Sequence, residues 1–123
     1  MELLVYKASA GSGKTFTLAV EYIRQLILNP RSYQQILAVT FTNKATAEMK
    51  ERILSQLYGI WIVDADSDAY LKRITQLTGM EEKEIRIAAG QALRYMLHDY
   101  TRFRVETIDS FFQSVMSNLA REL

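Results

Sequence analysis

The sequence contains no cysteine, a single proline and five glycines among its 123 residues. Without cysteine, disulfides and thiolate metal sites are excluded, which is compatible with a reducing compartment. The shortage of proline and glycine argues against a long flexible linker. No apolar run approaches the roughly 20 residues that cross a membrane, and no signal peptide precedes the first predicted strand. We therefore expect a cytoplasmic protein that has no membrane partner.

A strong charge of either sign is also missing. Fifteen Lys and Arg residues nearly balance fourteen Asp and Glu residues, and the formal net charge is +1. Any contact with a polyanion must therefore come from local groups rather than from a global positive field. Apolar residues make up 49% of the sequence, which is enough for the packed core of one domain or part of one.

The most informative stretch lies near the start of the sequence, between an apolar run at 3–6 and a periodic apolar segment at 16–28. It matches the phosphate-loop pattern G-x-x-x-x-G-K-[ST], except that alanine replaces the first glycine. Its residues, which form the predicted nucleotide-binding site, are Ala8, Ser9, Ala10, Gly11, Ser12, Gly13, Lys14 and Thr15. The first position requires a small residue, so alanine still allows the loop to turn.

Each residue type in this loop suits a polyphosphate. Gly11 and Gly13 let the backbone approach closely, and the N-terminus of the following helix adds unpaired N–H groups and a positive dipole end. Lys14 is predicted to reach the β- and γ-phosphates, and the Thr15 hydroxyl to ligate Mg²⁺. ATP and Mg²⁺ are therefore the expected cofactors, and Lys14 and Thr15 the expected catalytic residues.

The elements around the loop form a strand–helix–strand unit. A helix is predicted over 13–28, ended by Asn29-Pro30, and a buried strand over 36–41, parallel to the first strand. The loop would lie at the carboxyl end of the first strand, where open α/β sheets bind ligands. The pattern predicts an α/β fold: the parallel sheet of a partial P-loop NTPase with a small helical insertion, which the family resemblance given below further implies to be RecA-like.

Helical patterns dominate the rest of the sequence. Helices are predicted over 44–58, 67–78 and 81–99, with glycine stops at Gly59 and Gly79 and an apolar link at 60–63. A strand follows over 104–108, and Asp109 or Ser110 is expected to cap a last helix. We divide the chain into a P-loop part (1–59), a helical insertion (60–100) and a returning strand and helix (101–123).

Part of the hydrolytic machinery of a P-loop NTPase is not evident. A second apolar strand should end in an acidic residue that holds Mg²⁺, and Asp109 is the sole candidate. Helix capping is the favoured role for it. His98 has no acidic or cysteine cluster at ligand spacing, so we expect it to bind no metal. Phe103, with arginines on both sides, is either a small DNA-binding patch or part of a solvated strand edge.

Three segments together resemble the superfamily-one helicases of the UvrD/Rep/RecB type. The first is the phosphate loop and its continuation to Leu18, which is similar to the RecB/AddA branch (exonuclease V beta subunit) in opening with alanine. The second, 39–52, reads VTFTNKATAEMKER and is similar to motif Ia of that family. The third, 105–111, reads VETIDSF and resembles T-[IF]-H-S-F, with Asp109 in place of histidine.

The resemblance implies that the chain is the N-terminal part of helicase domain 1A, with the helical stretch as a short 1B subdomain. It implies that the D-E-containing motif II, the second RecA-like domain and any nuclease lie outside this chain. It also implies contact with single-stranded DNA through residues at two strand ends. These are Phe41, Thr42, Asn43, Lys44, Thr107 and Ser110.

Three functions remain open at this point. The favoured one is the ATP-binding part of an ATP-dependent DNA helicase or translocase, a hydrolase of recombination and repair, whose isolated N-terminal part is catalytically incomplete. A small P-loop kinase is the alternative, although no arginine-rich lid is evident and motif Ia would be unexplained. The third is a module that binds nucleotide or DNA without turnover.

Overall fold

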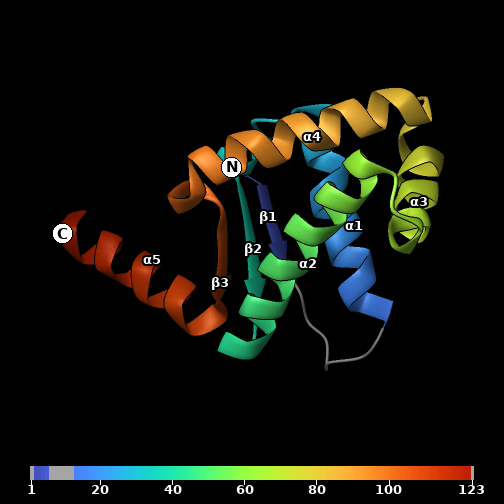
Figure 1. Ribbon diagram of the computed structural model, residues 1–123. Helices are drawn as coiled ribbons and strands as arrows, with labels where there is room; N and C mark the ends of the chain where they lie inside the picture. Colours follow the sequence, from blue (N-terminus) through green and yellow to red (C-terminus); the bar gives the residue numbers. More distant parts are fainter. Residues whose placement is uncertain (1, 6–12, 123) are drawn as a thin grey trace.

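A computed structural model describes the backbone of residues 2–5 and 13–122 and the side chains of residues 14–122. Three strands alternate with five α-helices and three short 3₁₀ helices, labelled η, along this part of the chain (Figure 1). The elements are β1 (Glu2–Val5), α1 (Gly13–Leu28), η1 (Ser32–Gln35), β2 (Ile36–Thr40), α2 (Asn43–Ile62), η2 (Ala65–Ser67), α3 (Asp68–Thr78), α4 (Glu82–His98), η3 (Tyr100–Arg102), β3 (Arg104–Thr107) and α5 (Ile108–Glu122).

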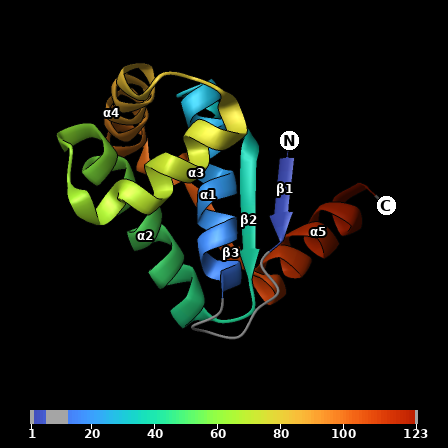
Figure 2. The same ribbon diagram turned by 90° about the vertical axis from the view of Figure 1, so that its right-hand side faces the viewer.

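The three strands form a parallel sheet in the order β1-β2-β3. All five residues of β2 are buried, as expected for the middle strand of a parallel sheet. Figure 2 shows α1, α2, α3 and α4 on one side of this sheet and α5 leaving on the other side. The α/β class with a parallel sheet, predicted from the sequence, is confirmed.

One hydrophobic cluster joins the sheet to four helices. It contains Ile23 of α1, Ala38 of β2, Ile53 of α2, Ile74 of α3 and Ile85 of α4. Helix α4 packs against α1 and α2, and α3 packs against α1. The helices after residue 60 thus share a core with the strand–helix–strand unit, and the division of the chain into three parts stays a prediction.

Helix α2 is longer than its sequence predicted. It continues through Gly59 to Ile62, so 60–63 is not a link between elements. Gly59 lies inside the helix, where a Cβ would come within 2.0 Å of Ser67 Oγ. The helix ends instead at Val63, which adopts the left-handed conformation with φ of 65°. Close packing, rather than helix termination, explains this glycine.

Two further expectations fail at helix faces and ends. The sequence pattern predicts Leu77 and Leu97 on apolar stripes, but both side chains are exposed because they lie at the borders of those stripes. The last helix begins at Ile108, so neither Asp109 nor Ser110 is its cap. By contrast, the predicted stop of α3 is confirmed, because Gly79 adopts a left-handed conformation with φ of 69°.

Candidate nucleotide and nucleic-acid site

The parallel register brings three strand ends to one edge of the sheet. Val5, the last residue of β1, pairs with Val39 of β2, and Thr40 at the end of β2 pairs with Thr107 at the end of β3. The ends of these strands therefore lie side by side (Figure 1). This carboxyl edge is where open parallel sheets bind their ligands.

The predicted phosphate loop lies in the sequence between β1 and α1. Residues 8–12 lie outside the described part of the chain, but the strand before them and the helix after them are both present. Gly13 is the first residue of α1, and Lys14 and Thr15 follow in its first turn. The Lys14 side chain is exposed and that of Thr15 is half-buried. The N-terminus of α1 thus has its positive dipole end and two polar side chains at the carboxyl edge of the sheet.

Phe41 follows β2 directly and leaves half of its side chain exposed, at 50%. It is therefore not the core residue that an aromatic side chain at a strand end commonly is. Next to it, Thr42 caps α2 with its Oγ1, which accepts a hydrogen bond from the Ala45 N–H at 3.0 Å. Asn43 and Lys44 begin α2 with exposed side chains, and Lys44 Nζ lies 4.0 Å from a carboxylate oxygen of Glu48.

The second group of predicted DNA contacts begins α5. Thr107 Oγ1 accepts a hydrogen bond from the Ser110 N–H at 3.2 Å, so the threonine rather than Asp109 or Ser110 satisfies the helix N-terminus. Asp109 lies exposed in the first helical turn, where its charge suits the dipole. The structure thus brings Thr107 and Ser110 together, beside the end of β2.

Thr40 lies in the motif Ia segment but was given no contact of its own from the sequence, and in the structure it links the two groups. Its side chain is buried, and its Oγ1 lies 2.6 Å from Thr46 Oγ1 and 3.5 Å from the Glu106 carbonyl oxygen. One hydroxyl therefore joins β2 to α2 and to β3. A polar residue closing an otherwise apolar strand was the signal available in the sequence.

The basic-aromatic patch around Phe103 is not formed. Phe103 is buried in the core, with 1% of its side chain exposed, and its ring meets that of Tyr22 edge to face. Arg102 lies 3.7 Å from an Asp99 carboxylate oxygen, and Arg104 pairs with Glu106. The DNA-binding interpretation of this segment is therefore wrong, because burial of the aromatic ring outweighs its position between two arginines.

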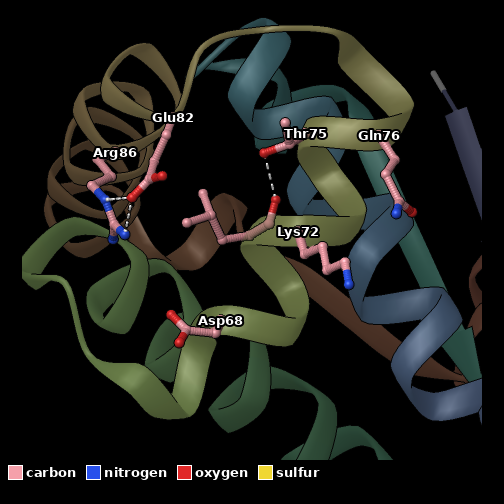
Figure 3. Close-up of a pocket in the computed structure, with 7 residues that line it drawn as sticks. Asp68, Lys72, Thr75, Gln76, Glu82 and Arg86 are labelled. Atoms are coloured by element: carbon pink, nitrogen blue, oxygen red, sulfur yellow. Dashed lines mark hydrogen bonds and ion pairs between the residues drawn. The ribbon is translucent and has the colours of Figure 1, made fainter.

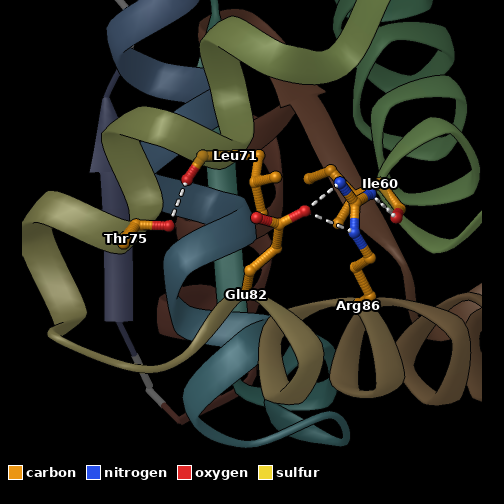
Figure 4. Close-up of polar contacts among 5 residues, drawn as sticks. All are labelled: Ile60, Leu71, Thr75, Glu82 and Arg86. Carbon is orange, nitrogen blue, oxygen red and sulfur yellow. Dashed lines mark hydrogen bonds and ion pairs between the residues drawn. The ribbon is translucent and has the colours of Figure 1, made fainter. Parts of the chain in front are cut away.

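A cavity of about 620 Å³ lies between α3 and α4, and none of its lining residues belongs to the predicted site. Asp68 and Lys72 of α3 and Glu82 and Arg86 of α4 are among its lining residues (Figure 3). Arg86 forms an ion pair with Glu82 and donates a hydrogen bond from Nη1 to the Ile60 carbonyl oxygen at 2.6 Å (Figure 4). Arg86 thereby satisfies a carbonyl of the last turn of α2, which is a structural role.

The described residues offer neither a metal cluster nor a membrane span. Residues 14–122 contain no group of three His, Asp or Glu side chains placed to hold a metal ion. His98 Nδ1 lies 3.2 Å from the Arg94 carbonyl oxygen of its own helix. None of the helices that the structure describes has the length and apolar content needed to cross a bilayer.

Comparison with known proteins identifies a family. Residues 2–123 match the family model of the UvrD/REP helicase N-terminal domain. The chain is 36% identical over 107 residues to an ATP-dependent helicase/nuclease subunit from Bacillus cereus strain AH820, and equally to the corresponding protein of Bacillus thuringiensis strain Al Hakam. The match covers 83% of this chain and 9% of each relative.

No solved structure matches the chain significantly. The family match nevertheless spans both strand ends described above and the segment between β1 and α1 that was predicted to be a phosphate loop. It agrees with the resemblance to superfamily-one helicases that the three sequence motifs suggested. The chain belongs to the family of UvrD/REP helicase N-terminal domains.

Proposed function

We propose that this chain is the ATP-binding N-terminal part of an ATP-dependent DNA helicase or translocase and that it contacts single-stranded DNA. The observation that supports this most is the pairing of Thr40 with Thr107. This pairing places the two segments with proposed DNA contacts, 41–44 and 107–110, at one edge of the sheet. The phosphate-loop helix begins at that same edge. The relatives that share 36% identity carry the name of an ATP-dependent helicase/nuclease.

ATP is proposed to bind at the loop of residues 8–15, with a P-loop NTPase sheet of the RecA-like type beneath it. Lys14 would contact the β- and γ-phosphates, and the Thr15 hydroxyl would ligate Mg²⁺, both from the first turn of α1. The positive dipole end of a helix N-terminus stabilises a bound anion such as a phosphate group. Mg²⁺ neutralises charge on the phosphates when it is bound.

Single-stranded DNA is proposed to lie across the ends of β2 and β3. The exposed Phe41 ring would stack on a base, a contact worth about 1–3 kcal/mol per base. Four polar groups would hold phosphates and fix the register without reading sequence. These are Thr42, Asn43, Thr107 and Ser110, and Lys44 would add a charge contact.

The isolated chain is proposed to bind without efficient turnover. Asp109 is exposed in the first turn of α5, with its charge placed to stabilise that helix. A P-loop NTPase also needs an acidic residue to hold Mg²⁺ and a group to position the attacking water. We propose that these groups belong to a longer protein, which also contains a second RecA-like domain and any nuclease. The DNA-repair activity, in the cytoplasm, is proposed to be that of the longer protein.

Nucleotide binding and turnover test this proposal together. A fluorescent ATP analogue with Mg²⁺ should bind the chain, and Lys14→Ala should abolish binding, whereas Lys72→Ala on α3 should not change it. ATP turnover by the chain should stay at background with and without single-stranded DNA. Transfer of phosphate to a small acceptor would favour the P-loop kinase instead. Equal binding by wild type and Lys14→Ala would contradict ATP binding at the proposed site.

A further inference from the structure

An aromatic contact joins the first turn of α1 to the start of α3. The Phe16 ring packs against the hydrophobic core, and its centroid lies 4.6 Å from that of the Tyr70 ring, with the two planes tilted by 53°. Aromatic rings in such contact attract one another beyond the effect of the apolar area that they bury. Lys14 and Thr15, the proposed nucleotide residues, precede Phe16 in the same turn. The contact therefore acts on the turn that carries them.

Phe16 is placed to control the direction in which Lys14 points. Phe16 is half-buried, whereas Lys14 in the same turn is exposed. These two positions are about 160° apart around the axis of an α-helix, so their side chains leave α1 on nearly opposite sides. The first N–H groups of a helix have no partner within the helix, so its first turn frays unless other contacts hold it. A ring held on the inner side opposes both fraying and rotation of this turn.

The start of α3 is tied to α2 at two points. Tyr70 is 6% exposed, and its hydroxyl accepts a hydrogen bond from Arg52 Nη1 at 3.1 Å. Ser67, just before α3, is also buried and lies against Gly59, where a Cβ would come within 2.0 Å of the serine Oγ. Arg52 and Gly59 are about two turns apart and lie on one face of α2. The start of α3 is therefore anchored on α2, and Tyr70 connects this anchor to α1.

We propose that Tyr70 is a positioning residue for the nucleotide site. Its ring holds Phe16, and thereby holds the first turn of α1 in the orientation that presents Lys14 to the phosphates. This inference rests on the proposed ATP-binding function. Tyr70 acts through Phe16 and is not itself a catalytic residue. The helices after residue 60 thus contribute to the nucleotide site as well as to the core.

Hydrogen exchange of the whole chain tests this contact without nucleotide. The N–H groups of residues 17–20 donate to the carbonyl groups of the first turn of α1, so their exchange reports whether that turn is formed. Tyr70→Leu should speed this exchange about tenfold, and Tyr70→Phe, which keeps the ring, should stay within about twofold of wild type. Leu93→Ala, on the buried face of α4, is the control for general destabilisation and should not affect residues 17–20 selectively.

Binding of a fluorescent ATP analogue with Mg²⁺ tests the role of Tyr70 at the site. Tyr70→Leu and Phe16→Leu should each raise the dissociation constant about tenfold. The double variant should bind no more weakly than either single variant, because both substitutions remove the same contact. Tyr70→Phe should bind like wild type, and so should Leu93→Ala at a temperature where circular dichroism shows it folded.

Four results would overturn the proposal. They are exchange at residues 17–20 that Tyr70→Leu does not change, equal nucleotide affinity of wild type and Tyr70→Leu, additive losses in the double variant, or an equal loss in Leu93→Ala. A wild type that binds no nucleotide would overturn the proposed function, and with it the nucleotide role of Tyr70. Faster exchange in Tyr70→Leu would then still show that Tyr70 holds α1, so the two failures are distinguishable.

Discussion

Thr40 and Thr107 are register partners at the ends of two parallel strands, and the Thr40 hydroxyl also lies 3.5 Å from the Glu106 carbonyl oxygen. This relationship sets two segments that are distant in sequence side by side. Thr40 further contacts Thr46 of α2 through its Oγ1. The sheet edge, the start of α2 and the start of α5 are therefore held in one arrangement, which is the frame of the proposed DNA site.

The cap of α2 makes a stability prediction. Thr42→Ala should lower the free energy of unfolding by about 1 kcal/mol, because the Ala45 N–H loses its acceptor. Urea denaturation measures this change. Thr101→Ala, at an exposed position in η3, is the matched control and should change stability by only a few tenths of a kcal/mol. Equal effects of both substitutions would show that the hydroxyl of Thr42 does not cap the helix.

The buried hydroxyl of Tyr22 leads to a second prediction about stability. Its side chain is fully buried, and the hydroxyl has no hydrogen-bond partner among the described residues. Tyr22→Phe should therefore raise the free energy of unfolding by about 1 kcal/mol, since an unpaired polar group leaves the core. Tyr58→Phe removes an exposed hydroxyl and should be neutral. A less stable Tyr22→Phe protein would mean that the hydroxyl is paired in solution.

The same residue predicts a response to alkali. Burial raises the pKa of Tyr22, and the nearby Tyr33 raises it further. The unfolded chain releases this proton near the ordinary tyrosine pKa of about 10, whereas the folded chain retains it. Stability should therefore be unaffected below that pH and should fall as the pH rises above it. Denaturation midpoints measured across this range should fall less steeply in Tyr22→Phe.

The residues that end α2 and α3 predict two substitutions with opposite effects on the stability of the chain. Val63 and Gly79 follow α2 and α3 with φ of 65° and 69°. Val63→Gly should stabilise the chain by about 1 kcal/mol, because a β-branched residue is strained there, and Gly79→Val should destabilise it by at least as much. A Cβ at Gly79 would have no atom within 4 Å, so backbone strain is the cause tested. Thermal melts measure both substitutions, and two changes of the same sign would refute the explanation.

The sequence predicted the strand–helix–strand unit well because local signals agreed there. Helix α1 was predicted with its observed bounds, and Phe41, which the resemblance placed at a strand end in contact with DNA, has an exposed side chain. Predictions failed where tertiary packing outweighed local preference. Gly59 leaves room for the Ser67 side chain instead of ending a helix. Phe103 is buried in the core instead of forming an exposed DNA-binding patch with the arginines on either side of it. Thr40 was missed because its role depends on a partner strand far along the chain.

The affinity of the chain for single-stranded DNA, compared between wild type and Phe41→Ala, tests the proposed site most directly. Fluorescence anisotropy with a labelled oligothymidylate should show a loss of about tenfold, the value of one stacked base. Leu28→Ala is the control, since Leu28 is a similarly exposed apolar residue at the C-terminal end of α1, away from the proposed DNA site. Loss in Phe41→Ala alone is the result we expect. Unchanged affinity in Phe41→Ala would contradict DNA contact at the carboxyl edge of the sheet.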